Sequence, residues 1–461
     1  MPTRQLRGSR LRRLAPALAL GVGVASLPAL GQVAEPPAHQ SLFEEQLTDD
    51  AHYAEGEPSI AVNPRDERNI IVTFLANTGF GTYGAQNDTA PTQRDFEETI
   101  QGCDYVVTFD GGRTWHRHTL PITNFDIDPT RPNCSDTLVT FDRQGVAYVV
   151  GSSYQFPTFT VGQGDFRMIS SRDGGRTWSK PSIVSPTLLS SGADYSQWKG
   201  ARFYDDREFM ALDDSTRTIY VVGTQGRLDA SGQAGDIEYL TGSQDGGHTW
   251  SDAIPVGGAS FSPPGAAFGT VALTSAPPNG ADRTCACLDF VVSNDRARSI
   301  VRRPTPIPGG SVNPLAGAAT AADPTRRHHF AVLAAEGDTL AVYRTPDEGR
   351  RWSKPSRISI QGRGVAKPWL AYSPHGVLGV GWRGTKDDGS YGFYVAISYD
   401  HGQHWSTRRI STADSPSNDQ IWVAGDDTSA IALTDTMLFA TWGDWRGHEL
   451  HTWWGGTPLR H

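Results

Sequence analysis

Short runs in which apolar and polar residues alternate recur along the whole chain. The runs at 105–109 and 393–397 show the two-residue period that is typical of strands with one buried face. Elsewhere a strand-like phrase ends in a turn and a second strand-like phrase follows it. The first phrases span 58–63, 137–142, 208–213 and 368–373, and the second ones span 69–74, 147–151, 218–223 and 377–382. No long run has the 3.6-residue period of an amphipathic helix, so the pattern predicts an all-β protein.

One phrase, Ser/Thr-x-Asp-x-Gly-x-Thr-Trp, follows several of these runs. Good or drifted copies lie at 108–115, 171–178, 243–250, 345–352 and 398–405, and a degraded copy lies at 293–300. The intervals between successive Asp residues are 63, 72, 50, 52 and 53 residues. A period of this size predicts a propeller or a solenoid, in which each repeat is one unit that stacks on its neighbours.

The phrase has the chemistry of a hairpin turn. Its Asp and Ser/Thr side chains can accept hydrogen bonds from the backbone of their own turn, and its Gly allows a positive φ. The Trp offers an apolar face to a neighbouring sheet. We therefore expect a structural role for the six Asp residues Asp110, Asp173, Asp245, Asp295, Asp347 and Asp400.

The repeated phrase resembles the Asp-box, or bacterial neuraminidase repeat, of sialidase-like β-propellers. The resemblance implies four-stranded antiparallel blades, each with its box between the third and fourth strands on the face away from the active site. Six boxes account for six blades, and strand-like runs at 429–434, 437–442 and 450–454 form part of another. The stretch 40–47 can supply the missing strand of that blade and close the ring. We expect seven blades, with six, the number usual in sialidases, as the alternative.

The amino terminus is typical of an export signal. Five arginines precede an apolar stretch from Leu14 to Leu30, and a small-x-small site precedes Gln32. A membrane anchor is the alternative, although Pro16 and Pro28 disfavour a spanning helix. The expected organisation is a signal peptide at 1–31, an N-terminal segment at 32–50 that completes the last blade, and the propeller at 51–457. The mature protein is then secreted or periplasmic, with no membrane partner.

Charge and cysteines narrow the function classes. Removing the five leader arginines takes the formal charge from −9 to −14, and so acidic a chain is not expected to bind nucleic acid. In an exported propeller Cys103 and Cys134 emerge on the same face, so we expect a disulfide between them. Cys285 and Cys287 are expected to be unpaired or strained, because alternate strand positions are too far apart for easy bridging. No motif calls for a metal or an organic cofactor.

The candidate functional residues are expected at the face opposite the boxes. Long loops there carry aromatic residues, among them Trp198 and Tyr204, which either bind sugar rings or pack the loops down. Aligning the four inner strands on their turns places one charged residue at a common level in each: Glu57, Asp136, Arg207 and Lys367. This ring either binds a polar ligand and supports acid–base chemistry or consists of ion pairs that satisfy one another.

A sialidase of this family holds the sugar carboxylate with three arginines, uses a Tyr–Glu pair as nucleophile and a separate Asp as acid/base. Its first arginine lies in an Arg-Ile-Pro phrase, whereas this chain has Glu57-Pro58-Ser59-Ile60. By position, Arg207, Arg383 and Arg446 are the candidate replacements. Arg446 can equally pair with Asp444 to lock the last blade. Tyr204 is the candidate nucleophile, with Asp206 and Glu208 as candidate acids beside Glu57 and Asp136.

Two function classes remain open. One is a sialidase-like glycoside hydrolase that acts on glycans or glycoconjugates at the channel mouth. The other is a non-catalytic propeller that binds a glycan or a protein there. Fold alone does not decide between them.

Overall fold

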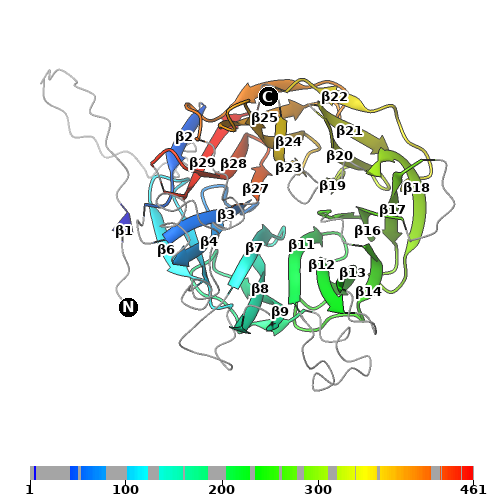
Figure 1. The fold of residues 1–461 in the computed structure, drawn as a ribbon, viewed down its shortest axis with the longest axis horizontal. Helices are drawn as coiled ribbons and strands as arrows, with labels where there is room; N and C mark the ends of the chain where they lie inside the picture. The colour runs from blue at the N-terminus through cyan, green and yellow to red at the C-terminus, as the bar shows by residue number, and fades with distance from the viewer. Residues whose placement is uncertain are drawn as a thin grey trace, which may run out of the picture.

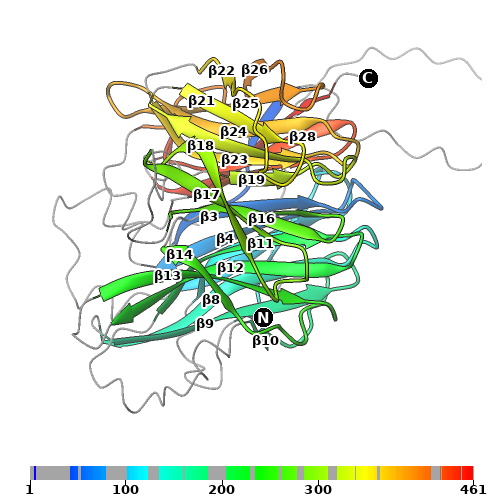
Figure 2. The same ribbon diagram turned by 90° about the vertical axis from the view of Figure 1, so that its right-hand side faces the viewer.

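The computed structural model describes residues 5–6, 42–49, 53–78, 101–122, 134–158, 161–184, 204–228, 234–258, 262–277, 285–309, 319–337, 339–360, 364–416, 426, 428–447 and 449–459, hereafter the described residues. They form seven antiparallel sheets arranged around a central axis (Figure 1). Seen from the side, the strands run across the thickness of the ring (Figure 2). No helix long and apolar enough to cross a membrane occurs among the described residues. The prediction of a seven-blade propeller is confirmed.

Blades 1 to 4 follow one another in sequence. Blade 1 contains β3 (Tyr53–Val62), β4 (Ile70–Thr78), β5 (Gln101–Thr108) and β6 (Trp115–Thr119), with β1 (Gln5–Leu6) paired to β6. Blade 2 contains β7 (Cys134–Phe141), β8 (Ala147–Thr158), β9 (Val161–Ser171) and β10 (Ser182–Ile183). Blade 3 contains β11 (Tyr204–Asp213), β12 (Thr218–Leu228), β13 (Ala234–Ser243) and β14 (Ile254–Gly258). Blade 4 contains β15 (Gly265–Ala267), β16 (Thr270–Ser275), β17 (Cys287–Ser293) and β18 (Val301–Pro308).

The remaining blades complete the ring. Blade 5 contains β19 (Ala319–Ala322), β20 (Phe330–Glu336), β21 (Thr339–Thr345) and β22 (Ser356–Ile358). Blade 6 contains β23 (Gly364–Tyr372), β24 (Leu378–Thr385), β25 (Tyr391–Ser398) and β26 (Ser406–Arg409). Blade 7 contains β27 (Ser429–Leu433), β28 (Met437–Asp444), β29 (His451–Pro458) and β2 (Phe43–Gln46).

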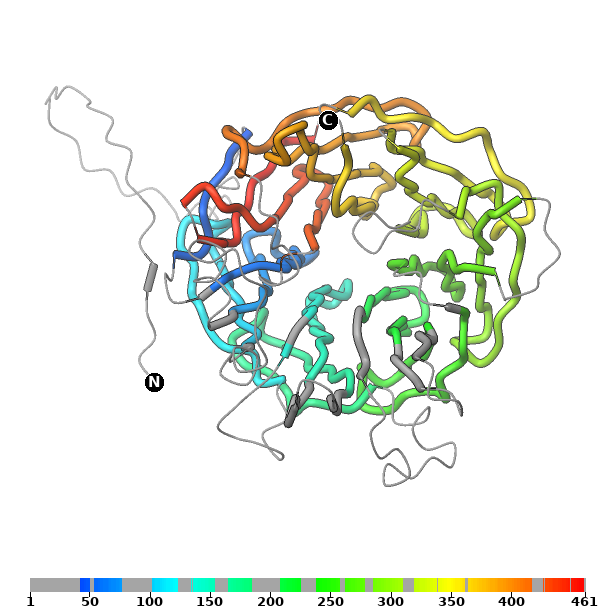
Figure 3. Tube along the Cα trace, viewed as in Figure 1, coloured from blue at the N-terminus to red at the C-terminus, as the bar shows by residue number. Residues whose placement is uncertain are grey.

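The N-terminal strand closes the ring, as expected for the stretch 40–47. Strand β2 pairs antiparallel with β29, so a strand from the N-terminal part of the chain and the last strand meet in one sheet (Figure 3). The Phe43 ring lies 4.7 Å from that of the fully buried Trp454. On its other side, Trp454 meets Trp115 of blade 1 at 4.9 Å. Aromatic packing therefore joins blade 7 to blade 1 across the closure.

The same pattern of hydrogen bonds occurs inside each of the six boxes. In blade 1, Asp110 Oδ1 accepts from the Thr114 amide (2.9 Å) and from Thr108 Oγ1 (2.8 Å), while its Oδ2 accepts from Thr114 Oγ1 (2.7 Å). Thr108 Oγ1 in turn accepts from the Gly112 amide (2.9 Å). Both side-chain oxygens of Asp110 and the hydroxyl of Thr108 thus have partners inside the turn.

The drifted boxes keep this network with other donors. Where the consensus has Thr, Arg351 Nε donates to Asp347 Oδ2 (2.6 Å), and His404 Nδ1 lies 2.5 Å from Asp400 Oδ2. In the degraded box, the Ser299 amide donates to Asp295 Oδ1 (2.9 Å). All six Asp residues are therefore held in turns between the third and fourth strands of a blade.

The boxes also connect neighbouring blades. Trp178 of blade 2 packs edge-on against Tyr105 of blade 1, and Trp352 of blade 5 packs against Phe290 of blade 4. Asn69, in the turn after β3, donates both to Thr108 O of its own blade and to Gly174 O of the next. The boxes therefore lie on the face where the inner strands end, which leaves the opposite face to the long connections.

Acid is expected to destabilise the propeller through the boxes. Partial burial opposes ionisation of Asp295, but hydrogen bonds from Ser299, Ser293 and Arg298 outweigh it and lower the pKa to about 2. The pKa values of the other five box Asp residues are lowered in the same way. A lowered folded-state pKa gives stability that is present above the unfolded value, about 4, and is lost as the pH falls through the folded value. Urea unfolding of the wild type should therefore show a falling free energy between about pH 4 and pH 2.

The control for this prediction is Asp295→Asn, which cannot ionise. Its unfolding free energy should depend less steeply on pH over the same interval. Equal slopes for the wild type and the variant would contradict the role given to the box carboxylate.

The four cysteines form two disulfides. Cys103 on β5 pairs with Cys134 on β7, which links blade 1 to blade 2. Cys285 pairs with Cys287, which excludes the first of the two expected alternatives, that they are unpaired. The reason is local: β17 begins only at Cys287, and Cys285 lies in a bend before it, free of the spacing that a strand imposes.

Candidate functional site at the mouth of the central channel

The charged residues that the sequence placed at one level lie in β-bulges of the inner strands. In blade 1 the register runs from Gly56 opposite Leu75 to Ser59 opposite Thr73, so two residues of β3 face one residue of β4. The same shift separates Ser135 from Leu138, Asp206 from Phe209 and Ala366 from Trp369. The skipped pairs are Glu57-Pro58, Asp136-Thr137, Arg207-Glu208 and Lys367-Pro368. Four inner strands therefore bulge at equivalent positions.

Three of these bulges begin with a non-glycine residue in the left-handed region of φ. The values are 51° for Glu57, 54° for Asp136 and 52° for Lys367. Such a backbone costs an L-residue about 1–2 kcal/mol, and strained residues of this kind cluster at functional sites. Bulges also redirect side chains next to active sites. The geometry therefore supports a site at this level of the channel.

Two aromatic side chains from opposite parts of the ring meet next to the bulges. Trp369 on β23 of blade 6 lies 6.4 Å, centroid to centroid, from Phe209 on β11 of blade 3. Trp369 also packs against buried clusters that contain Leu138 of blade 2 and Ala430 of blade 7. These neighbours come from the inner strands of blades 2, 3 and 7, so the Trp369 side chain extends from blade 6 toward the other side of the ring. Since each inner strand runs from its bulge toward the box face, this aromatic pair is a floor beneath the bulges.

The carboxylates of the bulges are largely buried. Glu57 is 6% and Glu208 1% exposed, and Glu208 Oε2 accepts from Ser152 Oγ of blade 2 (3.2 Å). Lys367 is 5% exposed, and its Nζ lies 3.6 Å from Asp426 Oδ2. Of the ring residues, Lys367 therefore pairs with an acid of the next blade that is not itself part of the ring.

Arg383 is buried and its donors are engaged by blade 7, and its role in binding substrate stays a prediction. It is 1% exposed, and its Nη1 and Nη2 donate to the two oxygens of Asp426 at 2.7 and 2.8 Å. Its Nε donates to Ser429 Oγ (2.9 Å), and Nη2 also donates to Thr428 O (3.0 Å). Burial opposes the charge on Arg383, but the adjacent Asp426 raises its pKa above the usual value. The guanidinium thus joins blade 6 to blade 7.

Arg446 pairs with acidic residues of its own blade, and its contact with substrate stays a prediction. Its Nε lies 3.1 and 3.0 Å from the two oxygens of Asp444, and its guanidinium pairs with Glu44 of β2. It also lies over the Trp453 ring at 3.9 Å. Arg446 therefore locks the closing strand to blade 7, the alternative that the sequence left open.

Other candidate residues lie outside what the structure describes. Trp198 falls in the undescribed stretch 185–203, and Tyr204, Asp206 and Arg207 are described in their backbone alone. They occupy the start of β11, with Asp206 opposite Thr224 of β12. Their backbone thus reaches the bulge of blade 3, and their roles remain predictions.

The sequence analysis did not identify two residues that make buried ion pairs in this region. Asp426 is fully buried and pairs with both Arg383 and Lys367. In the sequence it is marked only as an acidic residue in the connection before β27, which does not distinguish it from surface acids. The buried Glu55 pairs with Arg117 and lies 3.0 Å from His451 Nδ1. No group of three or more His, Cys, Asp or Glu residues that would hold a metal ion occurs among the described residues.

Comparisons with known proteins give the fold. No family model and no curated protein matches the sequence. A protein of unknown function from Dyadobacter fermentans superposes with a TM-score of 0.51 at 12% identity, covering 91% of this chain and 99% of that one. A Hadza microbial sialidase gives 0.45 at 12% identity (91% and 95% covered), and a Trypanosoma rangeli sialidase in complex with sialic acid gives 0.46 at 12% (91% and 57%). At 12% identity the likeness to the Dyadobacter fermentans protein shows a shared fold alone and no function.

Proposed function

We propose that this protein is an exported propeller that recognises a glycan at the channel mouth. The observation that carries the proposal is the floor made by Trp369 and Phe209 beneath a ring of charged bulge residues. A sugar ring has an apolar face and a rim of hydroxyls, so an aromatic floor within a polar wall complements it. Trp369 is only partly buried, which leaves part of its surface for a ligand.

The geometry favours a neutral sugar over sialic acid. Recognition of a carboxylate needs cations with free hydrogen-bond donors. Arg383 instead pairs with Asp426, and Arg446 pairs with Asp444 and Glu44. Glu57 stands where the family has its first arginine. Among the candidate arginines, Arg207 remains for an anionic sugar, and one arginine is a weak substitute for three.

Hydrolysis is the second candidate, favoured by the carboxylates at one level of adjacent blades. Glycosidases use two carboxyl groups, one as acid and one as nucleophile or base. Glu57, Asp136 and Glu208 begin or belong to the bulges of blades 1, 2 and 3. A screen of the mature protein against chromogenic neutral glycosides and sialosides separates hydrolysis from binding, since a binding protein releases no chromophore.

Removing the Trp369 side chain should strongly weaken glycan binding. A glycan array selects a glycan that the wild type binds, and calorimetry then measures its affinity. Trp369→Ala should weaken the binding of this glycan by at least about 2 kcal/mol, roughly thirtyfold, because a central aromatic contact is lost. The control is Trp178→Ala, which removes an aromatic side chain of the same size from the box face and should leave the affinity unchanged. Equal affinities for the wild type and Trp369→Ala would exclude the channel mouth as the site.

A further inference from the structure

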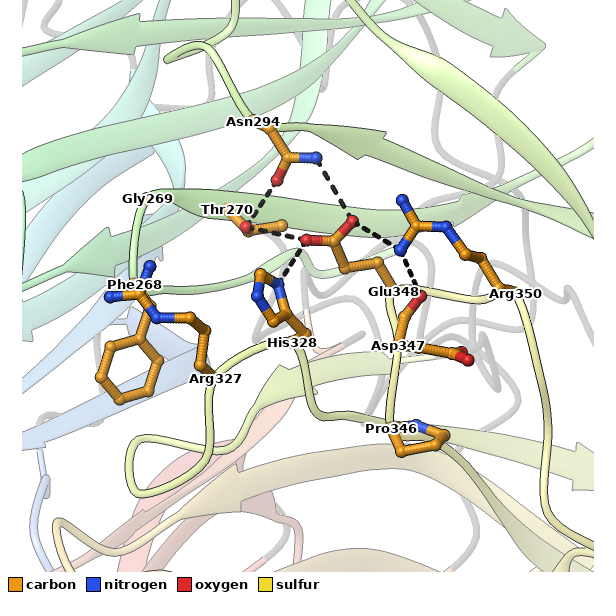
Figure 4. Close-up of a pocket in the computed structure, with 10 residues that line it drawn as sticks. All are labelled: Phe268, Gly269, Thr270, Asn294, Arg327, His328, Pro346, Asp347, Glu348 and Arg350. Carbon is orange, nitrogen blue, oxygen red and sulfur yellow. Dashed lines mark hydrogen bonds and ion pairs between the residues drawn. The ribbon is translucent and has the colours of Figure 1, made fainter.

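A cavity lies on the box face, between blades 4 and 5. Its volume is about 550 Å³. Its walls come from the β15–β16 turn, the turn after β19, and the boxes of blades 4 and 5 (Figure 4). The boxes and the channel mouth lie on opposite faces, so this cavity is separate from the candidate glycan site.

A buried carboxylate organises the cavity. Glu348 is 3% exposed, and its Oε1 lies 2.6 Å from His328 Nδ1, while Oε2 accepts from Asn294 Nδ2 (3.3 Å) (Figure 4). It occupies a box position that is Gly in blades 1 to 3, with a φ of 59° close to the 74–75° of those glycines. Arg296 (64°) and His401 (58°) have a similar φ at the same position of their boxes, so the turn imposes this conformation, and Glu348 adopts it with its carboxylate directed into the cavity wall.

Two other wall residues share this backbone strain. Phe268 has a φ of 54° and His328 a φ of 68°, both in the left-handed region that non-glycine residues rarely adopt. Together with Glu348, three strained residues from two blades meet at one cavity. Strain of this kind persists only where the surroundings enforce it.

Positive charge exceeds negative charge at the cavity. Arg350 and Arg303 lie 3.5 and 3.9 Å from Glu348 Oε2, and Arg351 pairs with Asp347. Burial and the neighbouring charge of Arg350 lower the pKa of Arg303, and the two nearby carboxylates do not reverse the shift. With Arg327, four arginines surround two carboxylates, although the whole chain has a formal charge of −9. The local potential is therefore cationic.

Arg327 is the donor that remains for a ligand. Its guanidinium lies over the Phe268 ring at 5.4 Å and makes no hydrogen bond or ion pair with the described residues. The side chain stands at the rim of the cavity beside Phe268, on the side opposite Arg350 (Figure 4). A guanidinium is planar and offers a fork of donors, which suits bidentate recognition of an oxyanion.

We propose that this cavity binds a tetrahedral oxyanion, as phosphate or sulfate present it, between Arg327 and Arg350. Glu348 does not compete for the ligand's place because His328, Asn294 and the arginines already occupy its oxygens. It positions the cationic wall instead. The oxyanion is either free or an ester on a sugar, and the two sources share this chemistry.

Calorimetry at constant ionic strength tests the proposal. The full chain is titrated with sodium phosphate, sodium sulfate and glucose 6-phosphate, with glucose as the uncharged reference. Saturable binding of the inorganic anions assigns the site to the free group. Binding of the ester alone assigns it to an anionic sugar. Both results support the proposal, and no saturable binding of any of the three overturns it.

The variants locate the binding. Arg327→Ala should weaken the binding of the anion about tenfold or more, because one charge-assisted contact is lost. The control is Arg143→Ala, an exposed arginine of blade 2 that pairs with Asp214 and should leave the affinity unchanged. Arg327 makes no structural ion pair with the described residues, so the variant should fold, which near-UV circular dichroism checks. Equal weakening by Arg327→Ala and Arg143→Ala would overturn the assignment to this cavity.

Discussion

Asp426→Ala is expected to destabilise the propeller by about 3–5 kcal/mol, the usual cost of removing one partner of a buried ion pair. The substitution leaves Arg383, 1% exposed, without its bidentate acceptor and removes the carboxylate next to Lys367. Because Asp426 joins inner-strand positions of blades 6 and 7, the loss should loosen that junction. Equilibrium urea unfolding, followed by tryptophan fluorescence, measures the change.

A matched control separates burial from charge in this experiment. Asp214→Ala removes the partner of the exposed Arg143 and should change stability by less than about 1 kcal/mol. If Asp426→Ala were as mild as Asp214→Ala, the account of Arg383 as a structural residue would fail. Arg383 would then become available again as a candidate for binding the substrate.

Removing the N-terminal strand should have an effect at least as large. A chain that begins at Ala51 lacks β2, so the outer edge of β29 loses its partner strand and Trp454 loses Phe43. Arg446 also loses Glu44, while remaining buried against Asp444. The expected loss is no less than that of a core Phe→Ala change, about 3–5 kcal/mol.

The control for the truncation is a chain that begins at Gln32, which keeps β2. It should unfold at the same temperature as the longer chain in differential scanning calorimetry. If the chain starting at Ala51 were as stable and as cooperative as the one starting at Gln32, the strand would not close the ring.

The fold was largely predictable from the sequence because its determinants are local. Each box carries its own hydrogen-bonding groups within eight residues, so Asp110 or Asp173 identifies a hairpin without knowledge of the rest of the chain. The inner strands could be aligned on Asn63, Asp142, Asp213 and Ser373, and this alignment located the bulges that the register shows.

The site was less predictable because its determinants lie between blades. Whether Arg383 meets a ligand or Asp426 depends on how blade 6 faces blade 7, which the spacing of residues along the chain does not encode. Trp369 was counted as an ordinary strand residue, since nothing local shows that its ring lies near Phe209. Cys285 was misjudged because the strand begins two residues later than expected.

The most direct test of the account is hydrogen–deuterium exchange of the mature protein with and without its array-selected glycan. The account predicts slower exchange at the four bulges, 56–59, 135–138, 206–209 and 366–369, and unchanged exchange at the six boxes. Slower exchange at the boxes with no change at the bulges would contradict recognition at the channel mouth.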